Sequence, residues 1–456
     1  MFRPRQEKKF KLSREFQKTI YTWIIHKFKL DYNETVKYLE NLQKGKIKTE
    51  IDNIKKVFIE LGNPQKRFTS IHIAGTNGKG SIGVMIDSIL REAGYSTGLY
   101  TSPHISEFTE RLKVSNNPIS ESELSNYVKR FKTYFEKYKC TYFEAATIIC
   151  FIYFYERKID IAVVETGMGG RWDATNVLNP IITVITDLGL EHQTYLGTTI
   201  EKIATEKGGI IKTGADCIVS ATQKAAVKTL KNTAKNQNAA YYQVYLYSKV
   251  KLKNMNINGT TFDYSQRDLN LKDLFIPLTG LHQVKNARTA IFTINRLKNL
   301  GFFVKNKDII NGLKNVKLDG RFETINKKPH IILDVGHNPD AFKVIKQTVK
   351  ALFPSKKIFL LFGTKLDKDY QSMIRIIKPI CREIVGIKLN NQNSLEPKKL
   401  IDITKKLKIK YTCFNSSEEG LKFLLKRGRK KDIILAAGSH ITVSEIKDRY
   451  FYLKNR

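Results

Sequence analysis

The sequence predicts an α/β protein of two domains, each formed around a largely parallel sheet. Short apolar stretches that end in glycine or a polar turn, such as SIHIAG and IDIAVVETG, alternate with stretches of helical periodicity. This alternation is typical of parallel sheets covered by helices. It starts again near residue 330 with HIILDVGHNPD, and a chain of 456 residues is long enough for more than one hydrophobic core.

We expect the chain to divide into three segments. They are a basic N-terminal extension over residues 1–20, a first domain over residues 21–315 and a smaller second domain over residues 316–456. The stretch INGLKNVKLDGRFETI lies between the two series of strands and is a candidate hinge. Residues 245–275 are rich in Tyr, Asn and Lys, and we expect irregular strands there.

Composition limits the class of protein. Hydrophobic residues make up 41% of the chain, an ordinary share for a globular protein. Five scattered cysteines without a C-x-x-C pair argue against a disulfide framework or a cysteine zinc site. No secretory signal is visible, and the longest apolar run, residues 143–155, is shorter than the roughly 20 residues of a membrane helix. We therefore expect a cytoplasmic protein with no membrane partner, and a buried helix over this run.

The net charge of +36, from 79 basic and 43 acidic residues, is high. A nucleic-acid partner is one explanation. The other is a lysine-rich composition, because the basic residues form no single stripe and do not alternate with aromatic residues as in an RNA-binding motif. We favour the second explanation and expect no nucleic-acid partner, although a basic surface also attracts small anions.

The stretch IHIAGTNGKGSIGV, residues 71–84, has the features of a phosphate-binding loop but departs from the usual consensus sequence. In G-x-x-x-x-G-K-[ST] the hydroxyl residue follows the lysine directly, whereas here Gly80 separates Lys79 from Ser81. A strand precedes the glycines and a helix follows them, so the loop amides can converge on phosphate oxygens while Lys79 adds a charge. The alternative is a structural turn with a solvated lysine.

Two more strands are followed by residues suited to metal or phosphate chemistry. Glu165 ends an apolar strand in VVETGMGGRWDATNV, and a carboxylate beside a phosphate loop commonly holds Mg²⁺. In ITDLGLEHQTYLGTTIEKIATEKGGIIK, His192 follows another strand and Lys207 lies late in an amphipathic helix. The alternatives are a hydrogen-bonded loop histidine and a helix-surface lysine.

Seven motifs occur in a fixed order: GTNGKGS, TSPH, ETGMGGRWDATN, EH…EKGGIIK, GLHQVKNA, GRFE and LDVGHNPDA. In this combination the chain resembles folylpolyglutamate synthase and the bifunctional dihydrofolate synthase/folylpolyglutamate synthase, members of the Mur-ligase superfamily, from about residue 38 to residue 439. The resemblance implies a Mur-ligase-like fold, with a P-loop parallel-sheet ATPase domain followed by a smaller Rossmann-like α/β domain that ligates glutamate. It also implies that the extra glycine is normal in this phosphate loop.

The chain departs from the family pattern in three places. GMGG stands where the family usually has GLGG, DVGHNP where it often has DGAHNP, and AAGSHITVSE diverges from the usual ending. No function is carried over to the last stretch.

The resemblance implies ATP-dependent amide ligation. The γ-phosphoryl group of ATP passes to a carboxylate, the uncharged α-amine of glutamate attacks the acyl phosphate, and phosphate leaves. Catalysis then consists mostly of positioning and of neutralising phosphate charge. The implied partners are ATP, Mg²⁺, L-glutamate and either dihydropteroate or a reduced folate, and the family implies a monomer.

The family's nucleotide and metal residues match positions in this chain. The implied phosphate ligands of the loop are Asn77, Gly78, Lys79, Gly80 and Ser81. The implied magnesium positions are Ser102, Glu165 and His192. Because imidazole is a poor ligand for Mg²⁺, His192 depends on the resemblance alone.

Further positions match across both domains. Lys207 matches the family's carbamylated lysine, in which CO₂ turns a cation into a carboxylate-bearing side chain. Asn286 matches a contact on the adenine side, and Arg321, Asp334 and His337 match residues of the second domain that reach back to the nucleotide. Lys207 and His337 are, with the lysine of the loop, the catalytic candidates, and ATP is expected between the domains.

The pterin pocket of the family matches the stretches TYFE and WDA. These are Thr141, Tyr142, Phe143, Glu144, Trp172, Asp173 and Ala174. The aromatic members can stack on or border a flat heterocycle. The alternative is that they are ordinary core aromatics.

The stretch TSPHISEFTERLKV and the intact TYFE favour the bifunctional type over a synthase that only extends glutamate tails. A Mur-type ligase for a cell-wall precursor is a second interpretation, but the short stretch before the phosphate loop leaves no room for its further N-terminal domain. A basic P-loop protein that binds nucleic acid is a third. This third interpretation gives no common function to Ser102, Glu165, His192 and Lys207.

Overall fold

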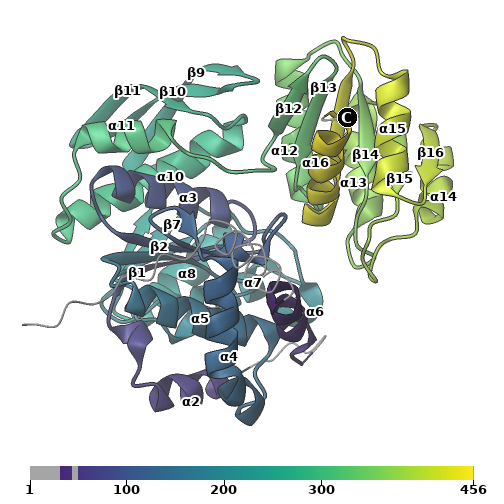
Figure 1. Cartoon of the computed structure of the whole chain (residues 1–456). Coiled ribbons are helices and arrows are strands. Elements are labelled where there is room, and N and C mark those ends of the chain that lie inside the picture. The colour runs from purple at the N-terminus through teal and green to yellow at the C-terminus, as the bar shows by residue number, and fades with distance from the viewer. Residues whose placement is uncertain (1–30, 44–49, 455–456) are drawn as a thin grey trace, which may run out of the picture.

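A sheet flanked by helices organises each half of the protein, as Figure 1 shows. The structure, a computed structural model, describes residues 31–43 and 50–454. The predicted basic extension over residues 1–20 lies outside the described residues. No helix in the described ranges is long and apolar enough to cross a membrane.

The sheet of the first domain has the strand order β4-β3-β2-β5-β1-β6-β7-β8. Its strands are β1 (Thr69–Ala74), β2 (Thr97–Tyr100), β3 (Leu112–Val114), β4 (Asn117–Pro118), β5 (Ile161–Glu165), β6 (Ile182–Ile185), β7 (Asp216–Val219) and β8 (Ala240–Gln243). From β2 to β8 all neighbours pair in parallel, and β3 and β4 add an antiparallel edge. Later strands lie on opposite sides of β1, a topology that favours ligand binding beyond its carboxyl end.

Helices cover both faces of this sheet. They are α2 (Asp52–Glu60), α3 (Lys79–Glu92), α4 (Glu121–Lys137), α5 (Tyr142–Glu156), α6 (Gln193–Leu196), α7 (Ile200–Gly208) and α8 (Lys224–Asn236), with the 3-10 turns η1 (Pro64–Lys66), η2 (Phe108–Arg111) and η3 (Ala174–Val177). α3 packs on one face of the central strands, and α2, α4 and α5 pack on the other. The buried helix predicted over residues 143–155 is confirmed as α5, whose apolar side chains point in all directions because it lies in the core.

The strands expected over residues 245–275 are confirmed, and the pairings between them contain register irregularities. After α9 (Val244–Tyr247), the strands β9 (Ser248–Asn256), β10 (Gly259–Gln266) and β11 (Leu269–Ile276) form an antiparallel sheet. α10 (Leu281–Asn299) and α11 (Asn306–Lys314) pack against it. β9 is an edge strand that exposes most of its side chains, in agreement with its many polar residues.

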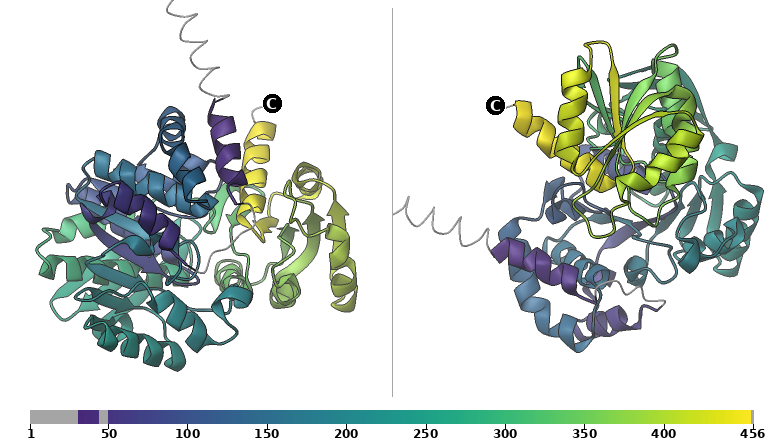
Figure 2. Two further views of the ribbon diagram at one scale, coloured as in Figure 1. Left: turned by 90° about the horizontal axis from the view of Figure 1, so that it is seen from below. Right: turned by 90° about the vertical axis from the view of Figure 1, so that its right-hand side faces the viewer.

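The second domain has the strand order β12-β13-β17-β14-β15-β16. Its strands are β12 (Glu323–Lys327), β13 (His330–Asp334), β14 (Ile358–Phe362), β15 (Cys381–Ile387), β16 (Lys410–Phe414) and β17 (Ile433–Ala437). Its helices are α12 (Pro339–Leu352), α13 (Tyr370–Ile377), α14 (Ile401–Lys406), α15 (Ser417–Arg427) and α16 (His440–Lys454), with η4 (Lys378–Ile380) and η5 (Pro397–Leu400). α12 to α14 cover one face and α15 and α16 the other, and Figure 2 shows the sheet between these layers.

A short connection from α11 to β12 joins the two domains. The predicted hinge stretch INGLKNVKLDGRFETI is therefore partly helix, partly connection and partly strand. The predicted boundary at residue 316 falls within the connection and stays a prediction. Asn338, at the start of α12, donates from Nδ2 to Oδ1 of Asn77 at 3.2 Å, so the second domain touches the phosphate loop directly.

Candidate active site

A large cavity lies where the carboxyl ends of the two parallel sheets face each other. Its volume is about 1270 Å³. Many lining residues come from the loops after β1, β2, β5, β6 and β7 in the first domain and after β13, β14, β15 and β17 in the second, and others come from the starts of α5 and α10. Ligands of parallel α/β sheets bind at such strand ends, and clefts between domains are common active sites.

The glycine loop leaves backbone amides at the cavity, as the sequence predicts. Gly78 caps α3 with a φ of +92°, and a Cβ atom there would lie only 2.7 Å from Oδ1 of Asn286, so this position requires glycine. The amide of Ile82 donates to the carbonyl of Gly78 at 2.9 Å. The amides of residues 79–81 precede this first helical hydrogen bond and are left to an outside acceptor such as phosphate.

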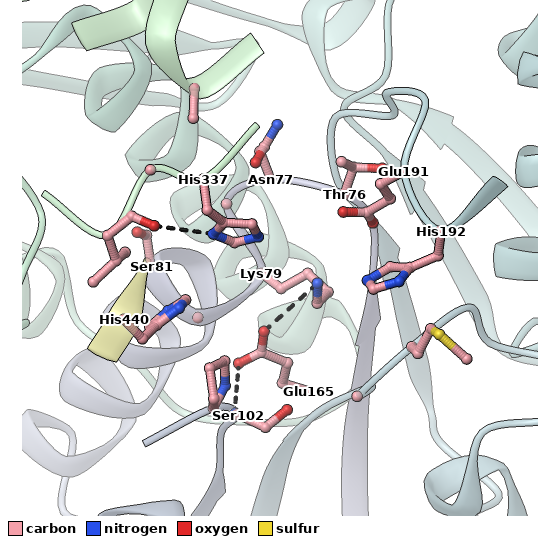
Figure 3. Close-up of a pocket in the computed structure, with 18 of the residues that line it drawn as sticks. Thr76, Asn77, Lys79, Ser81, Ser102, Glu165, Glu191, His192, His337 and His440 are labelled. Carbon is pink, nitrogen blue, oxygen red and sulfur yellow. Dashed lines mark hydrogen bonds and ion pairs between the residues drawn. The ribbon is translucent and has the colours of Figure 1, made fainter. Parts of the chain in front are cut away.

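Lys79 and Glu165 form the charged centre of the site (Figure 3). Nζ of Lys79 donates to the carbonyl of Gly75 at 3.0 Å and lies 3.8 Å from Oε1 of Glu165. Oε2 of Glu165 accepts the backbone N–H of Ser102 at 3.2 Å. Burial raises the pKa of Glu165, while Lys79 opposes the shift. Figure 3 shows the ring of His192 turned toward Lys79 from the opposite side.

The side chains at the predicted metal positions suit an ion that takes most of its ligands from a nucleotide. No group of three His, Cys, Asp or Glu side chains that could hold a metal occurs in the part of the chain that the structure describes. Glu165 offers a carboxylate, Ser102 a hydroxyl and His192 an imidazole. Mg²⁺ at phosphates is usually held by one or two carboxylates together with phosphate oxygens and water. Glu165 and Ser102 therefore fit such an ion, and His192 fits it poorly.

Lys207 lies beneath the phosphate loop rather than in the cavity wall. Its side chain is 1% exposed, so the alternative of a helix-surface lysine is wrong. Nζ donates to the carbonyl of Gly75 at 2.7 Å and to Oε1 of Glu191 at 3.1 Å. Burial lowers the pKa of Lys207 to about 8, although Glu191 acts in the opposite sense. Burial also raises the pKa of Glu191, but the charges of Lys207 and Lys79 outweigh it and bring the value down to about 2.

The second domain closes the cavity with Arg321, Asp334 and His337. Oδ2 of Asp334 accepts the backbone N–H of Phe322 at 3.0 Å, which holds the segment that carries Arg321. Nδ1 of His337 lies 3.0 Å from the carbonyl of Val335 and donates to it, leaving Nε2 as the acceptor. Burial lowers the pKa of His337 to about 4, so the ring is neutral at pH 7.

Residues of TYFE and WDA line a different part of the cavity. Thr141 and Glu144 form a capping box at the start of α5, since Oγ1 of Thr141 accepts the Glu144 amide at 3.2 Å and Oε2 of Glu144 accepts the Thr141 amide at 2.8 Å. Tyr142 and Phe143 follow in the first turn and are half-buried. Trp172 is 45% exposed, so the alternative of a core aromatic is wrong for this residue.

A buried chain of hydrogen bonds holds Asp173 in place. Oδ1 of Asp173 accepts the Thr175 hydroxyl at 2.5 Å, and Oδ2 accepts the Met168 amide at 2.9 Å. The Thr175 oxygen lies 2.7 Å from Nε2 of His72, on β1. Because the hydroxyl already donates to Asp173, Nε2 of His72 carries the proton and donates to Thr175. Ala174, between these residues, also lines the cavity.

Every residue predicted for the site lines this cavity except Lys207, which lies one layer below it. The lining members are Asn77, Gly78, Lys79, Gly80, Ser81, Ser102, Thr141, Tyr142, Phe143, Glu144, Glu165, Trp172, Asp173, Ala174, His192, Asn286, Arg321, Asp334 and His337. The roles of these residues stay predictions.

Among the side chains of the cavity wall that sequence reasoning missed are Arg111, His104, Glu191 and His440. Glu191 directly precedes His192, so the strand-end position was a usable signal. His440 follows β17 in the divergent stretch AAGSHITVSE, and the same signal applied to it. His104 and Arg111 lie in the stretch TSPHISEFTERLKV, but no sequence pattern shows that their side chains meet.

Two family descriptions match most of the chain. Residues 73–294 match the Mur ligase middle domain, and residues 320–440 match the Mur ligase glutamate ligase domain. A Bacillus subtilis (strain 168) protein described as dihydrofolate synthase/folylpolyglutamate synthase is 31% identical over 426 residues, which cover 92% of this chain and 99% of the relative.

Solved structures of similar proteins share the fold. Escherichia coli FolC in complex with DHPP and ADP has a TM-score of 0.85 and 26% identity, covering 93% of this chain and 98% of that chain. The bifunctional folylpolyglutamate synthase/dihydrofolate synthase of Yersinia pestis CO92, complexed with AMPPNP and Mn ion, has a TM-score of 0.82 and 25% identity, covering 92% and 98%.

The phosphate loop, the cavity between two α/β domains and the matched domains define an ATP-dependent amide ligase of the Mur type. The chain belongs to the family of folylpolyglutamate synthase and bifunctional dihydrofolate synthase/folylpolyglutamate synthase.

Proposed function

We propose that this protein ligates L-glutamate to dihydropteroate and to reduced folates, with ATP and Mg²⁺. The observation that carries the proposal is a single cavity that joins the phosphate loop, Glu165, the aromatic residues of TYFE and WDA and the loops of the second domain. The names of the similar proteins, and the nucleotides and divalent ion in their structures, support it.

In the first step, a carboxylate oxygen of the acid attacks the γ-phosphorus of ATP, the bond to the bridging oxygen breaks, and ADP leaves. The amides of residues 79–81 and the ammonium of Lys79 hold the phosphate oxygens and offset their charge. Glu165 and Ser102 would hold a magnesium ion, which would supply further charge neutralisation at the phosphates. Asn286, beside Gly78, is proposed to lie on the adenine side.

In the second step, the uncharged amine of glutamate attacks the acyl carbon, and phosphate leaves with the electron pair of the broken bond. The nitrogen then loses a proton as the amide forms. Arg321 is proposed to balance the phosphate charge, which suits its planar set of donors. Neutral His337, with Nε2 left as an acceptor, is proposed to take the proton. Asp334 keeps this wall in place.

The pterin ring is proposed to lie among Tyr142, Phe143 and Trp172, whose faces suit a flat heterocycle. Asp173 and Ala174 border the same space. The capping box of Thr141 and Glu144 would then act by fixing the helix start that presents the first two rings.

Lys207 is proposed to carry a carbamate. The neutral amine nitrogen bonds to the carbon of CO₂, one N–H proton is released, and a carboxylate-bearing side chain results. A pKa lowered by burial to about 8 favours the neutral amine that this reaction needs. A carbamate would help to hold metal or phosphates, whereas an ammonium repels a metal ion.

Removing the amine tests the carbamate. Lys207→Ala is expected to lose most ligase activity and to regain part of it when acetate or another small carboxylate is added, because the added anion replaces the carbamate. Circular dichroism and ADP binding show whether the variant is folded. A folded variant that no small carboxylate rescues contradicts the carbamate.

A glutamate-incorporation assay tests the proposed function directly. Purified protein with ATP, Mg²⁺ and radiolabelled glutamate is compared with dihydropteroate and with tetrahydrofolate as the acid. Labelled product and ADP with both acids are expected. Turnover of tetrahydrofolate alone would support the narrower alternative of a folylpolyglutamate synthase. No turnover of either acid would leave another Mur-type ligase as the better assignment.

A further inference from the structure

Arg111 is a buried cation that faces the cavity without an anionic partner. It is 7% exposed and lies at the end of η2, just before β3. No carboxylate of the described residues lies within 4.0 Å of its guanidinium, although the neighbouring Glu110 is close in sequence. The Glu110 carboxylate instead accepts backbone amides, including that of Ser106 at 2.9 Å. A buried charge without a partner is costly, and a ligand that supplies the opposite charge removes the cost.

Three side chains fix the position of the guanidinium. Nε of Arg111 donates to Nδ1 of His104 at 2.9 Å. Because a guanidinium N–H can only donate, Nδ1 of His104 is the acceptor, and the neutral ring carries its proton on Nε2. Cζ of Arg111 lies 5.7 Å from the ring centroid of Phe108 and 5.4 Å from that of Tyr142. The Nε edge and the stacking faces are therefore occupied, and the terminal NH₂ groups are left for a ligand.

The arginine stands between the aromatic part of the cavity and its charged centre. Tyr142, on which it stacks, belongs to the proposed pterin pocket. The carbonyl of Arg111 accepts the amide of Thr101 at 3.1 Å, which ties it to the loop that carries Ser102. Its charge also acts on the carboxyl of Glu165 and on His440 of the second domain. An acid bound in the aromatic part of the cavity with its carboxylate directed toward the charged centre would bring that carboxylate to Arg111.

We propose that Arg111, held by His104, is the residue that binds the carboxylate of the pteroyl acid before its activation. The two terminal nitrogens of a guanidinium match the two oxygens of a carboxylate, which a point charge such as lysine does not. The inference rests on the proposed function, because it takes a pteroyl acid as the ligand.

Binding measurements separate this role from a merely structural one. Calorimetry gives the dissociation constants of dihydropteroate and of its carboxamide, which keeps the rings and loses the charge. Wild-type protein is expected to bind the acid about 10- to 100-fold more tightly, as for hydrogen bonds between charged groups. Arg111→Met, which keeps an apolar side chain over Tyr142, is expected to weaken acid binding by that factor and to leave amide binding unchanged.

Two other variants complete the test. Lys113→Met removes a positive charge two residues further along, from a side chain outside the cavity lining, and is expected to keep the wild-type preference for the acid. Arg111→Lys keeps the charge and is expected to restore part of the preference. ADP affinity shows in each case whether the phosphate loop is intact. In turnover, the KM for dihydropteroate is expected to rise in Arg111→Met while the KM for ATP does not.

The outcomes distinguish the two proposals. If the wild type binds neither compound, the proposed function fails and this inference fails with it. If the wild type prefers the acid and Arg111→Met keeps the same preference, the role of Arg111 is overturned and the proposed function stands. Equal binding of acid and amide by the wild type also overturns the role of Arg111.

Discussion

Two lysines converge on a single backbone oxygen under the phosphate loop. Nζ of Lys79 and Nζ of Lys207 both donate to the carbonyl of Gly75, at 3.0 Å and 2.7 Å. Glu165 and Glu191 lie beside them and offset part of this charge. Phosphate oxygens entering at the loop would meet the ammonium of Lys79 already in position, which is how a preorganised site stabilises developing charge. Lys207 lies one layer below and does not line the cavity.

Lys79 is the first of these cations to test. Lys79→Met is expected to reduce kcat by at least about 100-fold, since one charge-assisted contact to a reacting phosphate is lost. ADP release is measured with saturating acid and glutamate. Lys55→Met removes an exposed lysine of α2 and is expected to leave kcat unchanged. A loss of less than about tenfold in Lys79→Met would remove the lysine from the mechanism.

The buried His72 predicts a loss of stability in acid. Burial lowers the pKa of His72 to about 3, against an ordinary value of 6.5. His72 therefore binds a proton below about pH 6.5 in the unfolded chain but only below about pH 3 in the folded chain. The contribution of His72 to the free energy of unfolding is therefore at its maximum above pH 6.5. It decreases by about 1.4 kcal/mol per pH unit as the pH falls toward 3.

Urea unfolding between pH 7 and pH 4.5 measures this effect. His72→Asn cannot take up the proton, so its stability is expected to fall less steeply with pH than that of the wild type. His337 and His104 are buried as well and contribute to the slope in both proteins. The same slope in both proteins would show that His72 is protonated in the folded state.

At the level of elements, two glycines in packed helices behave in opposite ways. An added Cβ at Gly312, in α11, would lie 2.5 Å from Cα of Ile89 in α3, and backbone atoms cannot move aside. An added Cβ at Gly83, in α3, would meet its nearest neighbour at an ordinary 3.6 Å. The close contact of α3 and α11 therefore depends on Gly312 and not on Gly83.

Alanine substitutions test this difference. Gly312→Ala is expected to destabilise the protein by about 1–3 kcal/mol because the two helices must move apart. Gly83→Ala is expected to be neutral or to stabilise by up to about 1 kcal/mol, through higher helix propensity. Thermal and urea unfolding give both values. Equal effects of the two substitutions would show that the helices are not in close contact.

The central parallel elements of the fold were predictable because each leaves a local signal. β1 and α3 are marked by an apolar run, a glycine turn and a helical period around Lys79, and α5 by its continuous apolar run. The strands of the β9–β11 sheet could be expected from the sequence, but their antiparallel pairing could not, because the edge strand β9 is mostly exposed and carries polar residues. Alternating burial is present in β10, where Phe262 and Tyr264 are buried, and at the start of β11, where Leu269 and Leu271 are buried.

The residues of the candidate site also divide into those that the sequence could place and those that it could not. Residues after strands, such as Glu165 and His192, could be placed from the sequence, because parallel strands bring their carboxyl ends to one edge. The burial of Lys207 could not, since its helix has the polarity of a surface helix and only packing under the loop covers it. The meeting of His104 with Arg111 depends on the path of η2, which no local pattern specifies.

At the scale of the whole molecule, the two domains have separate hydrophobic cores joined by one short connection. Ile332, Leu360 and their neighbours form one core cluster of the second domain without apolar residues of the first, and Ile105 of the first domain packs against the other cluster. Domains of this kind can unfold separately, and a ligand that contacts both links their stabilities. The cavity between them is therefore expected to couple the two cores when it is filled.

Calorimetry tests this coupling. The ligand-free protein is expected to melt in two transitions, and an ATP analogue with Mg²⁺ is expected to raise both, since residues of both domains line the cavity. Asn338→Ala removes the hydrogen bond to Asn77 and is expected to separate the transitions further. A single two-state transition without ligand would show that the domains already unfold as one unit.

Arg321 comes immediately after the connection between the domains, and its neighbour Phe322 is bonded to Asp334. An atom near the axis of a rotation travels a much shorter path than an atom at the rim of the same body. Slight breathing of the second domain would thus carry its outer loops away from the first while Arg321 barely shifts. If Arg321 binds phosphate as proposed, its contact would be the last to break when the domains separate, and products would leave first past the outer loops.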